Sequence, residues 1–481
     1  MGKVIFINPA LSMKERYGIL AQAGGTEPPF GLCYLASAMI KDGHSAYIID
    51  AQALNKDCQE TVDLVLKEKP NYAAITAVTA SIYSAAEIAR KIKDSNSEIT
   101  TIIGGPHLSS LPLETMKVFP EFDIGVFGEG EETLSALLDC LDKNKSLEAV
   151  NGLVVRRDND IFMTDKRNLI RDLDVLATPS FELLPDITRY YSVPAQSVDR
   201  LPAISLVTSR GCMGQCIFCD RSIFGNYCRA HSAEYVMSLI KKLYHEYGIR
   251  SFMFEDDNFT FFKQRLSRLI QLLNKEKLDL TWSCTARVDT VDANILKEMR
   301  NSGCWQVLYG IESGSQRILD FLDKNTKLSQ IEDALRMAKN AGINTKGFFI
   351  LGNPLETKES MEETIRFIKK ADLDDISLTF FTPYPGSEIY SSIDNYGQFD
   401  RDWKKTGQFQ ITFLPHGITK KELLSYSQRA YLSFYLRTKT FISYLRRVNN
   451  FSQFKVIFLS CIALIRYIFT NKNYSNEADN N

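Results

Sequence analysis

The chain has 481 residues, a formal net charge of -1 and a hydrophobic share of 44 %. A chain of this length exceeds what one hydrophobic core usually organises, so we expect two or three domains and exclude a lone small domain. The nearly neutral charge gives no sign of polyanion binding, which argues against nucleic acid as a partner.

The first ten residues, MGKVIFINPA, predict a β-strand over 4–8 that ends in Asn-Pro. They lack the charged start, long apolar core and small-residue cleavage site of an export signal. We therefore expect a cytoplasmic protein whose ten cysteines are reduced. In that compartment a close group of cysteines is more often a metal-binding or catalytic site than a disulfide framework.

Residues 1–150 alternate short β-branched runs with helical patterns. The runs VIFIN, SAYIID, YAAITAV, ITTIIGG and IGVFGEG are largely apolar, which is typical of parallel strands covered on both faces. This order predicts a doubly wound parallel sheet of the Rossmann or flavodoxin type. Ligands of such sheets bind at the carboxyl ends of the strands, where the sequence places Asn8, Pro9, Thr79, Gly104, Gly105, His107, Gly128, Glu129 and Gly130.

The remaining chain divides into three segments. Residues 151–200 predict a hairpin at LVVRRDNDIFMTD followed by an irregular, proline-bearing stretch, so we expect a linker. Residues 201–395 contain six strand-helix units, which predict a partial or full α/β barrel with its chemistry in the loops after the strands. Residues 396–481 mix aromatic and basic residues at helical spacing, which predicts a helical cap with a disordered tail.

The segment SLVTSRGCMGQCIFCDRS follows the first barrel strand and places Cys212, Cys216 and Cys219 on one tight loop. Three thiolates can ligate three irons of a cubane and leave the fourth iron open to a substrate atom, whereas structural zinc usually takes four closed protein ligands. The alternative is a zinc site completed by a remote residue such as His231 or Cys228, in a zinc-stabilised binding module.

This cysteine spacing, with Phe218 directly before the third cysteine, resembles the radical S-adenosylmethionine (SAM) superfamily. The resemblance implies a [4Fe-4S] cluster whose open iron binds the amino and carboxylate groups of SAM. An electron from the reduced cluster would break a carbon-sulfur bond of SAM, and the resulting 5'-deoxyadenosyl radical would abstract hydrogen from the substrate. The resemblance also implies an electron donor such as flavodoxin or ferredoxin.

The same resemblance assigns SAM contacts to the ends of the later barrel strands. The acidic run in FMFEDDNF would meet the methionyl ammonium, the arginine of TWSCTAR the methionyl carboxylate, and GIESGS the ribose. GFFILGNPLET and TPYPG would lie beside the adenine, where glycine lets the backbone approach closely. Leu355 stands where many members have glycine. The residues concerned are Glu255, Asp256, Asp257, Arg287, Glu312, Ser313, Gly352 and Tyr384. A capped helix start for the acidic run and a structural salt bridge for the arginine are the alternatives.

Residues 15–54, together with IIGGPHLSSLP and DIGVFGEGEET, resemble the N-terminal cobalamin-binding domain of one class of these enzymes. In that class the strand-end residues named above would contact cobalamin, with glycine-rich loops lying against the flat corrin. A flavodoxin-like domain that binds a nucleotide, or nothing, is the alternative. The motif Asp-x-His-x-x-Gly does not occur, which argues against a protein ligand on the lower face of the cobalt.

Within this class we expect transfer of a methyl group from methylcobalamin to an unactivated carbon, with one SAM re-methylating cobalamin and another producing the radical. The segments ERYG and GGTEPPFGL also resemble the anaerobic magnesium-protoporphyrin ester cyclase branch, so radical cyclisation, oxidation or rearrangement is the alternative. The substrate would be a small or lipid-like molecule. The C-terminal helices would cap the barrel or rest on a membrane surface, although the apolar stretch 454–469 is too short to span a bilayer.

Overall fold

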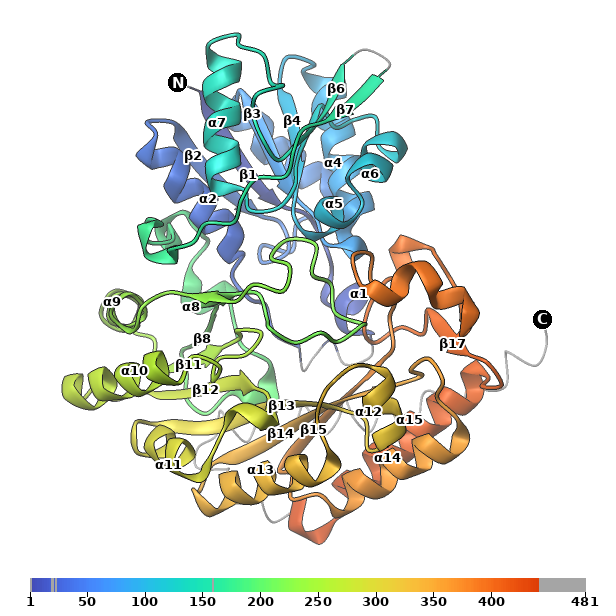
Figure 1. The fold of residues 1–481 in the computed structure, drawn as a ribbon. Helices are drawn as coiled ribbons and strands as arrows, with labels where there is room; N and C mark the ends of the chain where they lie inside the picture. The colour runs from blue at the N-terminus through green and yellow to red at the C-terminus, as the bar shows by residue number, and fades with distance from the viewer. Residues whose placement is uncertain (1, 19–20, 22–23, 158–159, 441–481) are drawn as a thin grey trace.

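The computed structural model describes residues 2–18, 21, 24–157 and 160–440. Its first unit is a seven-stranded sheet with helices on both faces (Figure 1). The strand order is β2-β1-β3-β4-β5-β6-β7, in which the first five strands are parallel and the last two add antiparallel. The strands are β1 (Lys3–Asn8), β2 (Ser45–Asp50), β3 (Tyr72–Thr76), β4 (Thr100–Gly104), β5 (Ile124–Val126), β6 (Leu153–Arg157) and β7 (Asp160–Met163).

Alternate side chains of β1 enter opposite hydrophobic cores. Ile5 and Ile7 belong to the core formed with α3 and α4, whereas Val4 and Phe6 belong to the core formed with α2 and α7. All four are fully buried, which explains why this strand is apolar at successive positions. The helices are α1 (Met13–Tyr17), α2 (Phe30–Lys41), α3 (Cys58–Glu68), η2 (Thr79–Ser81), α4 (Ile82–Ser95), α5 (Pro106–Ser110), α6 (Pro112–Val118) and α7 (Glu131–Asp142).

The hairpin expected in the linker forms, but its strands extend the first sheet, because β6 pairs with β5 and β7 pairs with β6. The chain then crosses to the second unit through short helical turns. Val193 of this crossing packs against inward-facing barrel residues such as Met253 and Leu308, so the crossing also fills part of the barrel. Its elements are η3 (Leu173–Val175), η4 (Phe181–Leu183), α8 (Ile187–Tyr190) and η5 (Ala195–Ser197).

The second unit is a partial barrel of six parallel strands in the order β15-β14-β13-β12-β11-β8, with helices outside (Figure 1). The doubly wound sheet and six-stranded partial barrel predicted from the sequence are thus confirmed. The strands are β8 (Ala203–Leu206), β11 (Ser251–Phe254), β12 (Thr281–Ala286), β13 (Cys304–Glu312), β14 (Asn344–Leu351) and β15 (Asp375–Phe380). The helices are α9 (Ala233–Glu246), α10 (Lys263–Glu276), η6 (Val288–Thr290), α11 (Ala293–Asn301), α12 (Gln316–Phe321), α13 (Leu328–Asn340) and α14 (Lys358–Lys370). A short antiparallel ladder, β9 (Ser209–Arg210) with β10 (Arg229–Ala230), flanks the cysteine segment.

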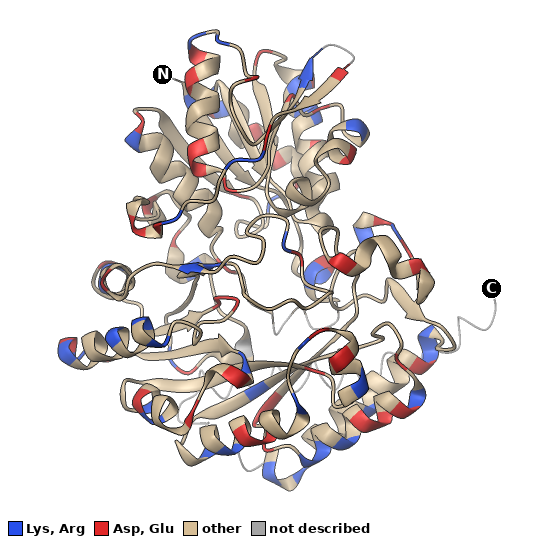
Figure 2. Ribbon diagram, viewed as in Figure 1, with Lys and Arg blue, Asp and Glu red and all other residues tan. Residues whose placement is uncertain are grey.

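The C-terminal region is helical only in part. It contains η7 (Glu388–Asn395), the antiparallel pair β16 (Gly397–Phe399) and β17 (Phe413–Pro415), η8 (Trp403–Lys405) and α15 (Lys420–Tyr435). The expected tail and the final basic helices fall in 441–481, outside the described residues. None of the described helices is long and apolar enough to cross a membrane. Figure 2 shows acidic and basic residues interspersed on the outer helices of the barrel, in keeping with the net charge of -1.

Candidate active site

The three motif cysteines lie on one loop between β9 and β10, here called the cysteine loop (residues 211–219). Gly214 approaches two of their thiols, since a Cβ added there would lie 3.4 Å from Cys212 Sγ and 3.8 Å from Cys216 Sγ. The Gly214 N–H donates to Cys212 Sγ (3.3 Å), and the Cys219 N–H donates to the Cys216 carbonyl (3.2 Å). The loop is therefore compact enough for its thiols to share one iron-sulfur cluster.

The surroundings of the cysteine loop favour the thiolate form of Cys216. Hydrogen bonding to the Cys219 thiol and the charges of Lys324 and Arg287 lower the pKa of Cys216 to about 6. The thiolate is the form that binds metal. Three cysteines on one loop suit a cubane, which spreads its ligands over different irons, whereas structural zinc usually takes four protein ligands.

The start of the cysteine loop is fixed by Asp256, which follows β11. Asp256 is 1 % exposed, and its carboxylate accepts from the Thr208 N–H (2.9 Å), the Thr208 hydroxyl (3.0 Å) and the Ser209 hydroxyl. Arg265 donates to the Thr208 carbonyl from the other side (3.0 Å). The Asp256 carboxylate, which the family resemblance assigns to SAM, accepts its hydrogen bonds from the segment that leads into the cysteines.

The two neighbours of Asp256 have different surroundings. Glu255 faces the loop that follows β1, and burial together with the negative charge of Glu27 raises the pKa of Glu255 to about 7. Glu27 pairs with Arg16 of α1 (2.6 Å). Asp257 is exposed, so its carboxylate is the most accessible of the acidic run. A contact between the SAM ammonium and this run stays a prediction.

Two ion pairs lie beside the cysteine loop. Arg287, after β12, donates to both carboxylate oxygens of Asp289 (3.0 and 2.9 Å) and to the Lys324 carbonyl (2.9 Å). Glu312, the last residue of β13, accepts from Lys324 Nζ (2.8 Å), and both side chains are buried. Lys324 was missed from the sequence because it stands in the polar stretch LDKNTK, where a lysine is usually solvated.

The other residues assigned to SAM lie in the barrel and its loops. Ser313 is buried, and its hydroxyl bonds to that of a threonine in α14 (3.2 Å). Gly352 has a φ of +80°, and its N–H donates to Glu356 (2.6 Å). Tyr384 is half-buried, and burial raises its pKa to about 12. Phe218 packs beside a small hydrophobic core at the barrel edge. Their contacts with SAM stay predictions.

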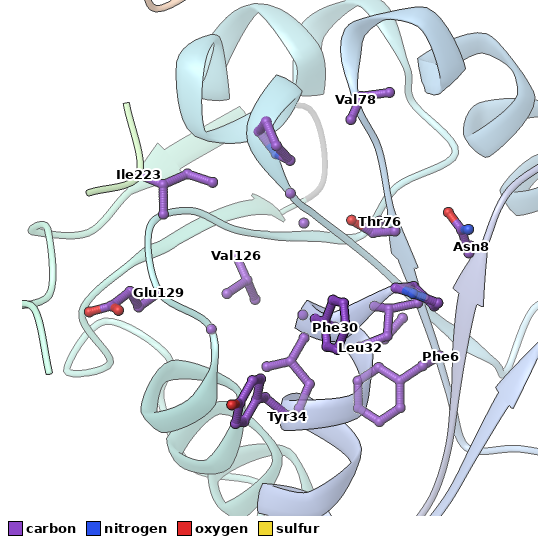
Figure 3. A pocket seen from close by; sticks show the side chains of 18 of the residues that line it. Phe6, Asn8, Phe30, Leu32, Tyr34, Thr76, Val78, Val126, Glu129 and Ile223 are labelled. Atoms are coloured by element: carbon purple, nitrogen blue, oxygen red, sulfur yellow. The ribbon is translucent and has the colours of Figure 1, made fainter. Parts of the chain in front are cut away.

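A cavity of about 560 Å³ opens at the carboxyl ends of the first sheet (Figure 3). Apolar side chains such as Phe6 and Leu32 line one part of it, and Val207 and Ser209 of the second unit close another. Glycine-rich loops around a cavity of this size suit a large flat ligand such as a corrin. Of the nine residues predicted for cobalamin, seven line the cavity: Asn8, Pro9, Gly104, Gly105, Gly128, Glu129 and Gly130.

Thr79 and His107 are not among the lining residues. His107 is fully buried, its Nδ1 lies 3.2 Å from the Thr79 hydroxyl, and its ring packs edge-on against Trp403 with 4.6 Å between centroids. Burial lowers the pKa of His107 to about 4, so the ring is neutral. The expected lining position of His107 is thus corrected, because a tryptophan of the C-terminal region covers its ring. The histidine that does line the cavity is His231.

Four charged side chains, here called the interdomain ion cluster, connect the cavity to the cysteine loop. Glu129 accepts from Arg210 (2.6 Å), from Arg229 (2.9 and 3.1 Å) and from the Ile170 N–H (2.8 Å). Arg210 also donates to Glu131. Burial alone would raise the pKa of Glu129, but the bonds from Arg229 and Arg210 outweigh it and lower that pKa. The sequence did not predict this cluster, because its partners are distant in the chain.

Two family models match the chain: the radical SAM superfamily over residues 206–368 and the B12-binding domain over residues 17–138. An uncharacterised methyltransferase of Pyrococcus horikoshii is 36 % identical over 421 residues, 87 % of this chain and 90 % of the relative. The chain belongs to the radical SAM superfamily. An anaerobic magnesium-protoporphyrin IX monomethyl ester cyclase of Rubrivivax gelatinosus is 27 % identical, covering 92 % of this chain and 79 % of that protein. A solved structure of the radical SAM methyltransferase TsrM of Kitasatospora setae, with cobalamin and a [4Fe-4S] cluster bound, has a similar fold, with a TM-score of 0.70 and 14 % sequence identity. The match covers 90 % of this chain and 89 % of TsrM.

As a radical SAM enzyme with a B12-binding domain, this protein uses a [4Fe-4S] cluster, SAM and cobalamin. The cysteine loop fits the cluster and the cavity fits cobalamin, on the geometry given above. The zinc-stabilised binding module is therefore set aside. His231, suggested from the sequence as a remote zinc ligand, lines the cavity at the ends of the first sheet instead and has both ring nitrogens hydrogen-bonded.

Proposed function

We propose that this radical SAM enzyme transfers a methyl group to an unactivated carbon of a small or lipid-like molecule. The observation that supports this most directly is the cavity at the ends of the first sheet, which shares a wall with the segment leading into the cysteine loop. When bound, the cluster supplies the electron that cleaves SAM, and cobalamin carries the methyl group.

The chain's own residues would position the reactants. The three cysteines would hold the cluster, and Asp256 would fix the loop that carries them by its bonds to Thr208 and Ser209. Arg287 and Lys324 place positive charge beside the cysteines, where an anionic carboxylate of SAM would be stabilised. Glu312, the partner of Lys324, is the acceptor we assign to the ribose hydroxyls.

Isotope transfer tests this function. Purified enzyme with reconstituted cluster and cobalamin would be incubated anaerobically with SAM deuterated in its methyl group and with an extract of cells that lack the protein. Methyl transfer predicts a new product that carries the intact deuterated methyl. A new product without label would favour the cyclisation or rearrangement alternative and contradict the proposal.

The cysteine assignment has its own test. Cys216→Ala should abolish the formation of 5'-deoxyadenosine and the broad iron-sulfur absorbance, while cobalamin stays bound because its cavity is built elsewhere. Cys58→Ala, a thiol in the first unit outside the cavity, is the matched control and should retain both signals. Unchanged SAM cleavage by Cys216→Ala would refute the assignment.

Flavodoxin or ferredoxin is the proposed electron donor, and a membrane contact of residues 441–481 stays a prediction.

A further inference from the structure

A chain of three hydrogen-bonded side chains crosses from the linker to the cobalamin cavity. Asp174 Oδ1 lies 3.1 Å from His231 Nδ1, and His231 Nε2 lies 3.2 Å from the Tyr34 hydroxyl. The three residues come from three parts of the fold: η3, the segment after β10, and α2. Tyr34 and His231 both line the cavity, whereas Asp174 does not. Asp174 therefore reaches the cavity only through the other two.

The surroundings of His231 determine the direction of these bonds. Its ring stacks on Tyr235, with centroids 4.0 Å apart, and lies nearly parallel to the Tyr34 ring at 5.8 Å. Burial lowers the pKa of His231 to about 4. The neutral ring carries one N–H. Because the Asp174 carboxylate only accepts, that proton sits on Nδ1, and Nε2 must accept the Tyr34 O–H.

Tyr34 has thus committed its only proton to His231, and its oxygen retains capacity as an acceptor. The Tyr235 hydroxyl lies 3.5 Å from that oxygen, but its single proton has a shorter bond to the Ala177 carbonyl (3.3 Å). Glu129 and Glu131, which also line the cavity, are already paired with Arg210, so the Tyr34 oxygen is a neutral acceptor beside them. Cobalamin carries primary amide groups on the arms around its corrin ring, and each amide nitrogen is a twofold donor.

We propose that Tyr34 accepts a hydrogen bond from an amide N–H of a corrin side arm, and that His231 and Asp174 act as positioning residues that hold the Tyr34 oxygen in the accepting orientation. The inference rests on the assigned cobalamin cavity and adds a specific recognition element to it. Because His231 belongs to the barrel unit and Tyr34 to the cobalamin domain, this element is complete only when the two are docked.

The test uses the full-length protein with its cluster reconstituted. Hydroxocobalamin is titrated into it at fixed pH, and the dissociation constant is read from the absorbance changes. Tyr34→Phe removes one net hydrogen bond and should weaken binding about 2-fold to 12-fold. Tyr72→Phe is the matched control: its hydroxyl bonds to Asp142 (2.6 Å) in the same domain, outside the cavity, and it should bind as the wild type does. Binding by Tyr34→Phe equal to that of the control would overturn the proposal.

A second variant separates positioning from mere structure. Asp174→Ala leaves every cavity-lining side chain in place and should weaken hydroxocobalamin binding less than Tyr34→Phe does. Asp174→Asn keeps an acceptor oxygen for His231 and should bind hydroxocobalamin as the wild type does. In the Tyr34→Phe background, Asp174→Ala should cause no further loss of hydroxocobalamin affinity. A further loss as large as that in the wild-type background would refute the coupling between Asp174 and Tyr34. Should Tyr34→Phe fail to fold, the Asp174 pair still decides the question. Wild-type protein that binds no hydroxocobalamin would refute the cofactor assignment itself, not the role of Tyr34.

Discussion

Glu129→Ala is expected to weaken the junction between the cobalamin domain and the barrel far more than removal of an ordinary surface carboxylate. The mutation removes the acceptor shared by Arg210 and Arg229, whose side chains are 12 % and 9 % exposed. Arg210 keeps Glu131, but Arg229 keeps only the Ile170 carbonyl, and its Nε and Nη2 already lack partners among the described residues. Breaking a buried pair in this way costs about 3–5 kcal/mol, because a charge is left uncompensated.

The matched control is Glu234→Ala, which removes an exposed pair with Arg268 (2.7 Å) and should lower the free energy of unfolding far less, because solvent screens that pair. Urea unfolding followed by circular dichroism, at low and high salt, measures the loss of unfolding free energy in each variant. Salt should reduce the effect of Glu234→Ala but leave that of Glu129→Ala nearly unchanged. Since the folded state lowers the pKa of Glu129, its contribution is present above the ordinary glutamate pKa and is lost as the pH falls below it. A loss no larger than that of the control would refute the reasoning.

Two further predictions concern single residues. Leu355 has a φ of +62° and is 45 % exposed, so Leu355→Gly should relieve backbone strain and raise the free energy of unfolding by about 0.5–1 kcal/mol. Leu436→Gly, at a φ of -79°, is the control and should not raise it. A loss of stability in Leu355→Gly would contradict the strain at that residue. Because the folded protein raises the pKa of Glu255 to about 7, the wild type should lose stability relative to Glu255→Gln as the pH rises from about 4.5 to 7, with a constant difference above that range. Denaturation across this pH series checks it, and a difference independent of pH would exclude the raised pKa.

Patterns that are local in the chain predicted the fold well. The apolar runs predicted both sheets because a strand buried on two faces is apolar at successive positions. The thiol spacing predicts a metal-binding loop because three ligands on one short segment need no other part of the fold, and this assignment stays a prediction. Seven of the nine residues predicted at the strand ends line the cavity, for the same reason.

Pairings between distant segments could not be predicted. Arg210 and Glu129 are 81 positions apart, and nothing near either residue in the chain indicates the other. His107 was misplaced for a related reason, since the residue that covers it, Trp403, comes from the opposite end of the chain. Asp256 was assigned to SAM by resemblance, but its hydrogen bonds to Thr208 and Ser209, which lead into the cysteine loop, depend on how neighbouring barrel strands align.

The cavity proposed for cobalamin has walls from both halves of the molecule, with Val207, Ser209 and Arg210 on the barrel side. A corrinoid bound there would contact both halves at once. Its release would then require the buried ion pairs of Glu129 with Arg210 and Arg229 to break, so the strength of this junction would set how long the cofactor stays bound.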